Sequence, residues 1–200
     1  METQVKLSDR LDAWLRGDDP KTLDSLIALF GEKGFAILFV ILLAVAALPL
    51  PTGGVTHVFE VIAMLLALEL IAGRRQVWLP RRWRERDLGP AAQQRFRELL
   101  VKRIRWLESR SRPRLGGLLS HRLSGVVYGL VVLGLSLTAF VAPPFTGLDT
   151  LPAMGVVVIS VGILLEDSLI VLAGTMIGAL GVFVVIGLGR LIVEAIGALF

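Results

Sequence analysis

The sequence lacks cysteine and contains only two histidines and one tyrosine in 200 residues. Without cysteine, disulfide bonds, thiolate metal sites and cysteine nucleophiles are excluded. A protein metal site needs three or four ligands, whereas the single His57-x-x-Glu60 pair supplies two. Nucleophile elbows, phosphate loops and dinucleotide-binding fingerprints are also absent. We therefore expect no metal and no cofactor, and a protein that is not an enzyme.

Charged residues are scarce in several long stretches of the chain. Apolar residues make up 54% of the sequence and the mean hydropathy is +0.74, whereas soluble domains contain roughly 45–50% apolar residues even with glycine counted. Only the run 168–189 meets the simple criterion of about 18 uncharged apolar residues for a spanning helix. Four other apolar runs are shorter: 35–48, 55–72, 125–142 and 151–165. The chain is therefore predicted to be a membrane protein.

The basic residues are concentrated in one region. Fifteen of the 21 Lys and Arg residues lie between Arg74 and Arg122, against four acids there. By the positive-inside rule, the N-terminus and this 74–122 loop face the cytoplasm. A basic amphipathic helix is expected over about 90–110, in the plane of the membrane interface. Because the loop adjoins a membrane segment, anionic lipid headgroups are the expected partner, and nucleic acid is not.

Two of the apolar blocks are interrupted in the same way. The run 35–48 stops at Pro49, Pro51, Gly53 and Gly54, and the run 125–142 stops at Pro143 and Pro144. Matching Pro/Gly breaks in two halves are typical of discontinuous helices that form a substrate or ion site. Fourteen residues rise only about 21 Å, which is less than the hydrocarbon core of about 30 Å. We expect both breaks to be re-entrant tips, and the alternative is that they are ordinary turns outside the membrane.

Several charged residues are candidates for the same site. Glu166 and Asp167 lie between apolar runs, where an acid is a functional hypothesis by default. They are expected to carry protons or cations, and the alternative is a tight turn capped by two acids. Glu69 either joins the site or extends toward Arg74 or Arg75 at the interface.

His57 and the two arginines complete the predicted site. His57 directly follows the first break and is expected to have a hydrogen-bonding or pH-sensitive role there. Arg74 and Arg75 are expected to attract an anionic solute.

These patterns predict an all-α, polytopic membrane protein built from two pseudo-repeated helical hairpins, with the repeats parallel rather than inverted. The glycine step Gly174-x-x-x-Gly178 favours a homodimer or tight self-packing. The expected organisation is an amphipathic N-terminal cytoplasmic segment (1–33) on the membrane surface or against the bundle, and a membrane domain (34–200). The membrane domain comprises a first hairpin (34–73), the basic cytoplasmic loop (74–123) and a second hairpin with a final transmembrane helix (124–200).

An ordered set of short motifs resembles the ExoD family of bacterial proteins, from about residue 20 to the end. The motifs are Pro49-Leu50-Pro51, Gly73-Arg74, Trp78-Leu79-Pro80-Arg81-Arg82, the Pro143-Pro144 pair, Leu151-Pro152-Ala153 and Gly162-x-x-x-Glu166-Asp167. The resemblance implies a multi-pass protein of the bacterial inner membrane that is linked to exopolysaccharide synthesis. Two positions depart from the family pattern, because Glu69 replaces Gln and Ser168 replaces Gly.

Two functions remain open from the sequence. The leading one is a transporter or translocator of a small or lipid-linked anionic solute, bound at the two breaks. The alternative is a non-transporting scaffold that binds anionic lipids or a polysaccharide-synthesis complex through the basic loop.

Overall fold

The chain forms only helices and their connections in the residues that the computed structural model describes: 7–17, 20–48, 55–85, 101, 105–106, 108–109, 111, 122–142 and 146–197. The predicted all-α class is therefore confirmed. The helices are α1 (Leu7–Arg16), α2 (Leu23–Phe30), the 3-10 helix η1 (Gly31–Lys33), α3 (Gly34–Leu43), α4 (Val55–Ile71), α5 (Arg81–Arg84), α8 (Arg122–Val141), α9 (Thr150–Leu164) and α10 (Ser168–Gly197).

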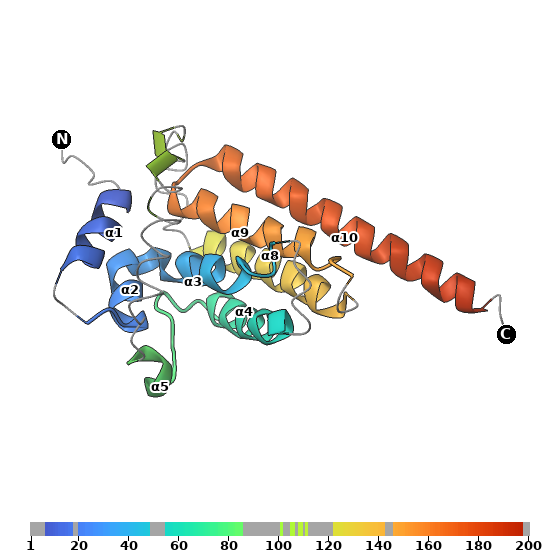
Figure 1. The fold of residues 1–200 in the computed structure, drawn as a ribbon, viewed down its shortest axis with the longest axis horizontal. Coiled ribbons are helices and arrows are strands. Elements are labelled where there is room, and N and C mark those ends of the chain that lie inside the picture. Colours follow the sequence, from blue (N-terminus) through green and yellow to red (C-terminus); the bar gives the residue numbers. More distant parts are fainter. Residues whose placement is uncertain are drawn as a thin grey trace.

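Four of these helices form the central bundle. α3 packs against α4 and α9, and α8 packs against the same two helices. Each helix of the first half therefore contacts a helix of the second half, and the chain passes up and down between the two ends (Figure 1). We call the end that carries the 49–54 and 143–149 connections the break end. The opposite end, which carries the 72–121 connection and the turn at 165–167, is the loop end.

The surface of the bundle is strongly apolar. Leu65 of α4 is 58% exposed, Leu130 of α8 54% and Phe183 of α10 76%. Soluble monomers rarely expose contiguous apolar patches of this extent. Leu123–Val141 in α8 and Ser168–Gly189 in α10 are also long and apolar enough to cross a membrane. The two long apolar helices suggest a membrane location.

α10 folds back along α9 in a close antiparallel contact that depends on glycine. A Cβ placed on Gly155 would lie 2.5 Å from the Cα of Gly178, and one on Gly174 would lie 2.5 Å from the backbone nitrogen of Ile159. Only glycine lets the two backbones approach so closely. The tight packing predicted from the Gly174 and Gly178 step therefore occurs within the chain, and a homodimer stays a prediction.

α10 is longer than the bundle. Gly181 faces Pro152 at the start of α9, while nothing approaches Gly187 or Gly189 within 4 Å. Figure 1 shows α10 continuing past the other long helices toward the C-terminus. The apolar run of α10 continues for about eight residues beyond Gly181, or about 12 Å at 1.5 Å per residue. The second break therefore lies short of the far end of that run.

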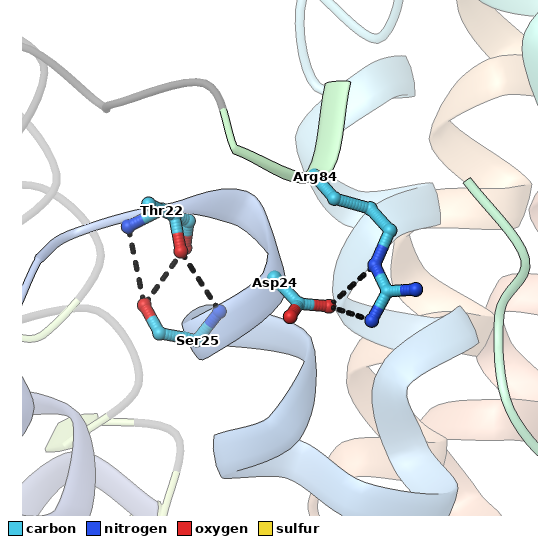
Figure 2. Close-up of polar contacts among 4 residues, drawn as sticks. All are labelled: Thr22, Asp24, Ser25 and Arg84. Carbon is cyan, nitrogen blue, oxygen red and sulfur yellow. Dashed lines mark hydrogen bonds and ion pairs between the residues drawn. The ribbon is translucent and has the colours of Figure 1, made fainter. Parts of the chain in front are cut away.

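The N-terminal helices cover the loop end. Leu11, Leu26 and Phe30 are buried in the same core as α3. A capping box begins α2: the backbone N–H of Ser25 donates to the Thr22 hydroxyl at 3.2 Å, and that of Thr22 donates to the Ser25 hydroxyl at 3.1 Å (Figure 2).

Asp24, in the first turn of α2, also connects this region to the basic connection. Its carboxylate pairs with the guanidinium of Arg84 in α5 at 2.9 Å (Figure 2). Of the two placements expected for the segment 1–33, its described residues adopt the packed one.

Candidate functional site at the break end

The residues that flank the two breaks meet at the break end. Ala46 and Ala47, just before the first break, pack against Ala153 in the first turn of α9. The Thr56 hydroxyl, just after the first break, donates to the Asp149 carboxylate at 3.5 Å. Pro49, Pro51, Gly53, Gly54, Pro143 and Pro144 themselves lie outside the described residues. The described residues that flank the two interruptions are therefore neighbours in space, although about 90 residues separate them in sequence.

A fully buried carboxylate lies one turn into α4. The Glu60 side chain is 0% exposed, and its Oε2 lies 2.7 Å from Nδ1 of His57. The His57 ring in turn meets the ring of Phe140 at a centroid distance of 5.4 Å. Asp149, before α9, lies close enough to interact electrostatically with Glu60. His57, predicted from its place after the break, is thus part of a titratable cluster.

This cluster has unsatisfied hydrogen-bonding capacity. In the part of the chain that the structure describes, the buried side-chain oxygens without a partner are Oε1 of Glu60 and Oγ of Ser136. α4 and α8 run antiparallel, with Gly129 against Ala67 and Phe140 against His57. That register places Ser136 level with Glu60. A buried unpaired polar group costs about 1–3 kcal/mol, so two at one level of the bundle indicate a place that can accept a polar guest.

The charge of the break end is unusual. Segments 44–60 and 136–153 contain no Lys or Arg, and the cationic partner of Glu60 in the described residues is the imidazole of His57. α4 and α9 both begin here, and the first N–H groups of a helix have no intrahelical partner. Their dipoles place partial positive charge at this end and favour anions. The described residues contain no group of three or more His, Cys, Asp and Glu that could hold a metal ion. The arrangement can therefore bind protons on the carboxylates and an anionic group at the helix ends.

Glu166 and Asp167 lie at the loop end, in the turn between α9 and α10. The Lys33 ammonium contacts Glu166 Oε1 at 2.8 Å and the Leu164 carbonyl at 3.0 Å. Glu166 has a φ of 56°, and Asp167 accepts from the backbone N–H of Leu169 at 2.9 Å. These contacts are those of a capped tight turn, with a cation supplied from the first half of the chain. The proton-carrier role of the two acids stays a prediction.

Glu69, Arg74 and Arg75 also lie at the loop end. Glu69 accepts from the backbone N–H of Trp78 at 2.9 Å, and both arginines are exposed. α4 ends in a left-handed Gly73, with φ of 81°, that turns the chain away. The 17 residues of α4 rise about 25 Å. The structure therefore does not bring the two arginines to the break end.

An apolar groove runs between α8 and α10. Its volume is about 330 Å³ and it is lined by Leu130, Val131, Gly134, Leu135, Thr138, Thr175, Ala179 and Val182. The two threonine hydroxyls donate to the carbonyls of Gly134 and Val171 in their own helices. The groove therefore presents an apolar wall that extends toward the break end.

From the sequence, Glu60 is interpreted as a metal ligand that lacks enough partners, and neither Asp149 nor Ser136 is a candidate. One feature of the sequence could have identified Glu60 as a site residue: it lies in an apolar run without Lys or Arg. The same argument selected Glu166.

Comparison with known proteins identifies relatives of the chain. Residues 7–187 match the family described as "Exopolysaccharide synthesis, ExoD". An uncharacterized protein of Synechocystis is 31% identical over 179 residues, covering 88% of this chain and 84% of the relative. Protein ExoD of Rhizobium meliloti is 30% identical over 184 residues, covering 86% of this chain and 73% of the relative. No solved structure matches the chain.

Proposed function

The chain belongs to the ExoD family, and from this premise we propose that it is an inner-membrane protein that translocates a lipid-linked anionic solute in exopolysaccharide or envelope metabolism. In this proposal the break end binds the anionic group. The N-terminus and the 74–122 loop face the cytoplasm, so the loop end is cytoplasmic. The process is a movement of solute and involves no covalent chemistry.

The observation that carries the proposal is the contact between residues that flank the two breaks. Thr56 and Asp149 lie 3.5 Å apart at their nearest oxygens, and each follows a break. The contacts of α3 with α9 and of α8 with α4 are those expected of two parallel hairpins related by a pseudo-twofold axis along the bundle. In such repeats, half-helix N-termini near the axis bind anionic substrate groups. α4 and α9 are placed to do so.

The register of α10 supports a break inside the membrane. Its apolar run extends about 12 Å beyond Gly181, which faces the first turn of α9. If that run spans the hydrocarbon, the start of α9 lies below the far surface. Irregular backbone at that depth must be buried by protein or solvated in a cavity.

The apolar groove supports a lipid-linked solute. It lies between two helices that expose apolar side chains, so it would open sideways into the acyl chains of the bilayer. It extends to Val182, close to the level of the breaks. A solute could therefore keep its tail in the groove while its headgroup reaches the helix N-termini.

A cysteine-accessibility scan of 49–54 and 143–149 tests the proposal, since the native chain has no cysteine. We expect a small polar thiol reagent to label the breaks and a bulky impermeant reagent to label them poorly. Gln76→Cys, exposed at the cytoplasmic loop end, is the accessible control for purified protein in detergent, where both ends meet the reagent. Leu180→Cys, exposed on the apolar surface of α10, is the control that should stay unlabelled in membranes. Rapid labelling of both breaks by the bulky reagent from the periplasm would show that they are ordinary turns.

The exposed basic connection favours a second candidate function, that of a lipid-binding scaffold. Trp78 is 61% exposed beside the exposed arginines Arg74, Arg75, Arg81 and Arg82. Such a surface suits anionic headgroups, with about 1 kcal/mol for each basic residue near the membrane. For a scaffold, charge reversal across 95–105 should abolish exopolysaccharide production, while Pro51→Ala should reduce it only slightly. For a carrier, Pro51→Ala should abolish exopolysaccharide production and charge reversal across 95–105 should reduce it only slightly.

A further inference from the structure

The Glu60–His57 pair is a buried titratable group to which the proposed translocation assigns no role. We infer that this pair is a proton-binding site at the break end, and that its proton is taken up together with the anion. The proton site stands on the geometry of α4, α8 and α9. The coupling to an anion rests on the proposed function.

The geometry allows one more proton than the pair needs for its own hydrogen bond. Glu60 is fully buried, one oxygen is 2.7 Å from the imidazole, and the other has no partner. With a single shared proton the pair is neutral overall. A second proton from water binds the free Oε1 and gives a net charge of +1, and loss of the shared proton gives −1.

The elements around the pair supply little other charge. α4 contributes His57 itself, and the connection before α9 contributes Asp149. α8 contributes Phe140 at the imidazole and Ser136 at the same level, and α3 has no ionisable side chain. Among the described residues around the pair, the ionisable side chains are therefore Glu60, His57 and Asp149.

That dependence links the proton to the anion. A unit anion about 6 Å from an ionised Glu60 would bind roughly 100-fold more weakly than beside the protonated acid, at an effective dielectric constant of 20. Protonation removes this repulsion and leaves the attraction of the α4 and α9 N-termini. By linkage, a bound anion raises the proton affinity of the pair by the same factor.

Histidine NMR of the full chain in lipid nanodiscs tests the proton site. His121→Gln leaves His57 as the only histidine, so its ring signals report the pair directly. We expect the titration midpoint of His57 to change when Glu60→Gln removes the carboxylate, because the two side chains share a 2.7 Å hydrogen bond. Glu69→Gln, at the other end of α4, is the matched control and should leave the midpoint unchanged. An equal midpoint with and without Glu60, or no titration of His57 at all, would overturn the inference.

His57→Asn gives a second test if Glu60→Gln does not fold. It removes the imidazole and keeps the buried carboxyl group. The infrared C=O band of the protonated acid should then persist to higher pH than in the parent, because the partner that favours the ionised form is gone. A band that does not respond to pH in either protein contradicts a proton site.

A lipid probe separates this inference from the proposed function. Short-chain phosphatidic acid should shift the His57 midpoint, and the zwitterionic phosphatidylcholine of equal chain length should not; binding of each lipid is measured separately. If the midpoint depends on Glu60 but phosphatidic acid neither binds nor shifts it, the proton site holds and anion binding at the break end fails. If phosphatidic acid binds without moving the midpoint, the coupling is wrong.

Discussion

Replacing Gly155 by alanine adds one methyl group at the closest contact between α9 and α10. The new Cβ would lie 2.5 Å from Cα and 2.7 Å from N of Gly178, which are backbone atoms that cannot rotate away. Carbon atoms pack best at about 3.5–4.0 Å, so the two helices must separate by about 1 Å. The same shift would move the first turn of α9, and Asp149 before it, relative to Thr56.

The magnitude follows from two opposing effects. Overpacking of a close contact typically costs about 1–3 kcal/mol, whereas alanine is favoured over glycine in a helix by about 1 kcal/mol. We expect Gly155→Ala to lower the free energy of unfolding by up to about 2 kcal/mol. At Gly187 of α10 nothing lies within 4 Å, so only the helix preference remains there. Gly187→Ala should therefore stabilise the protein by up to about 1 kcal/mol.

The comparison is made by titrating micellar protein with sodium dodecyl sulfate and following helicity by circular dichroism. The two variants carry the same chemical change on adjoining helices, so a difference in sign isolates the packing effect. The reasoning is refuted if Gly155→Ala unfolds at or above the wild-type midpoint, or if Gly187→Ala is the more damaging change. Either result would mean that α9 and α10 are farther apart than the structure places them.

Three further substitutions test contacts described above, each with unfolding as the readout. Lys33→Met removes the partner of Glu166. Because both side chains of the pair are just under 30% exposed, we expect the free energy of unfolding to fall by only about 0.5–1 kcal/mol. A larger fall would contradict the assignment of this contact as a weak, partly solvated ion pair. Tyr128→Phe breaks the buried 2.7 Å hydrogen bond to Ser160 and should cost about 1 kcal/mol, and a loss that persists in a Ser160→Ala background would contradict that origin. Asp167→Asn preserves the cap of α10 and should leave the free energy of unfolding nearly unchanged, whereas Asp167→Ala should lower it by about 1 kcal/mol. If the asparagine variant is stable but loses solute flux, Asp167 has a proton-carrier role.

Hydropathy and turn chemistry predicted most of the helix positions. The run 55–72 became α4 and the run 151–165 became α9, because uninterrupted apolar residues bounded by Pro, Gly or charge leave few other choices. α3 is shorter than its run and ends at Leu43, although the backbone N–H of Ala47 still donates to the carbonyl of Leu43 at 2.8 Å. α10 continues to Gly197, since a single Arg190 does not end a helix.

The site was less accessible to sequence reasoning. α4 is apolar on every side, so periodicity could not show that Glu60 is buried while Glu69 accepts a hydrogen bond from the backbone of Trp78. Lys33 and Glu166 are 133 residues apart, and such a pair leaves no local pattern. The meeting of Thr56 with Asp149 likewise depends on how two hairpins pack. Matching breaks indicated that two segments correspond, and the packing of the halves determines that the residues flanking them touch.

The unequal lengths of α4 and α10 have a consequence for lipid around the bundle. Both helices expose apolar side chains, but the 17 residues of α4 span about 25 Å and the 30 residues of α10 about 45 Å. Leaflets adapt to a short hydrophobic surface by thinning. Spin-labelled lipids in nanodiscs should therefore report a thinner bilayer beside α4 than beside α10, and uniform thickness would refute this. A headgroup that crosses beside α4 would have a shorter path through hydrocarbon than one that crosses beside α10.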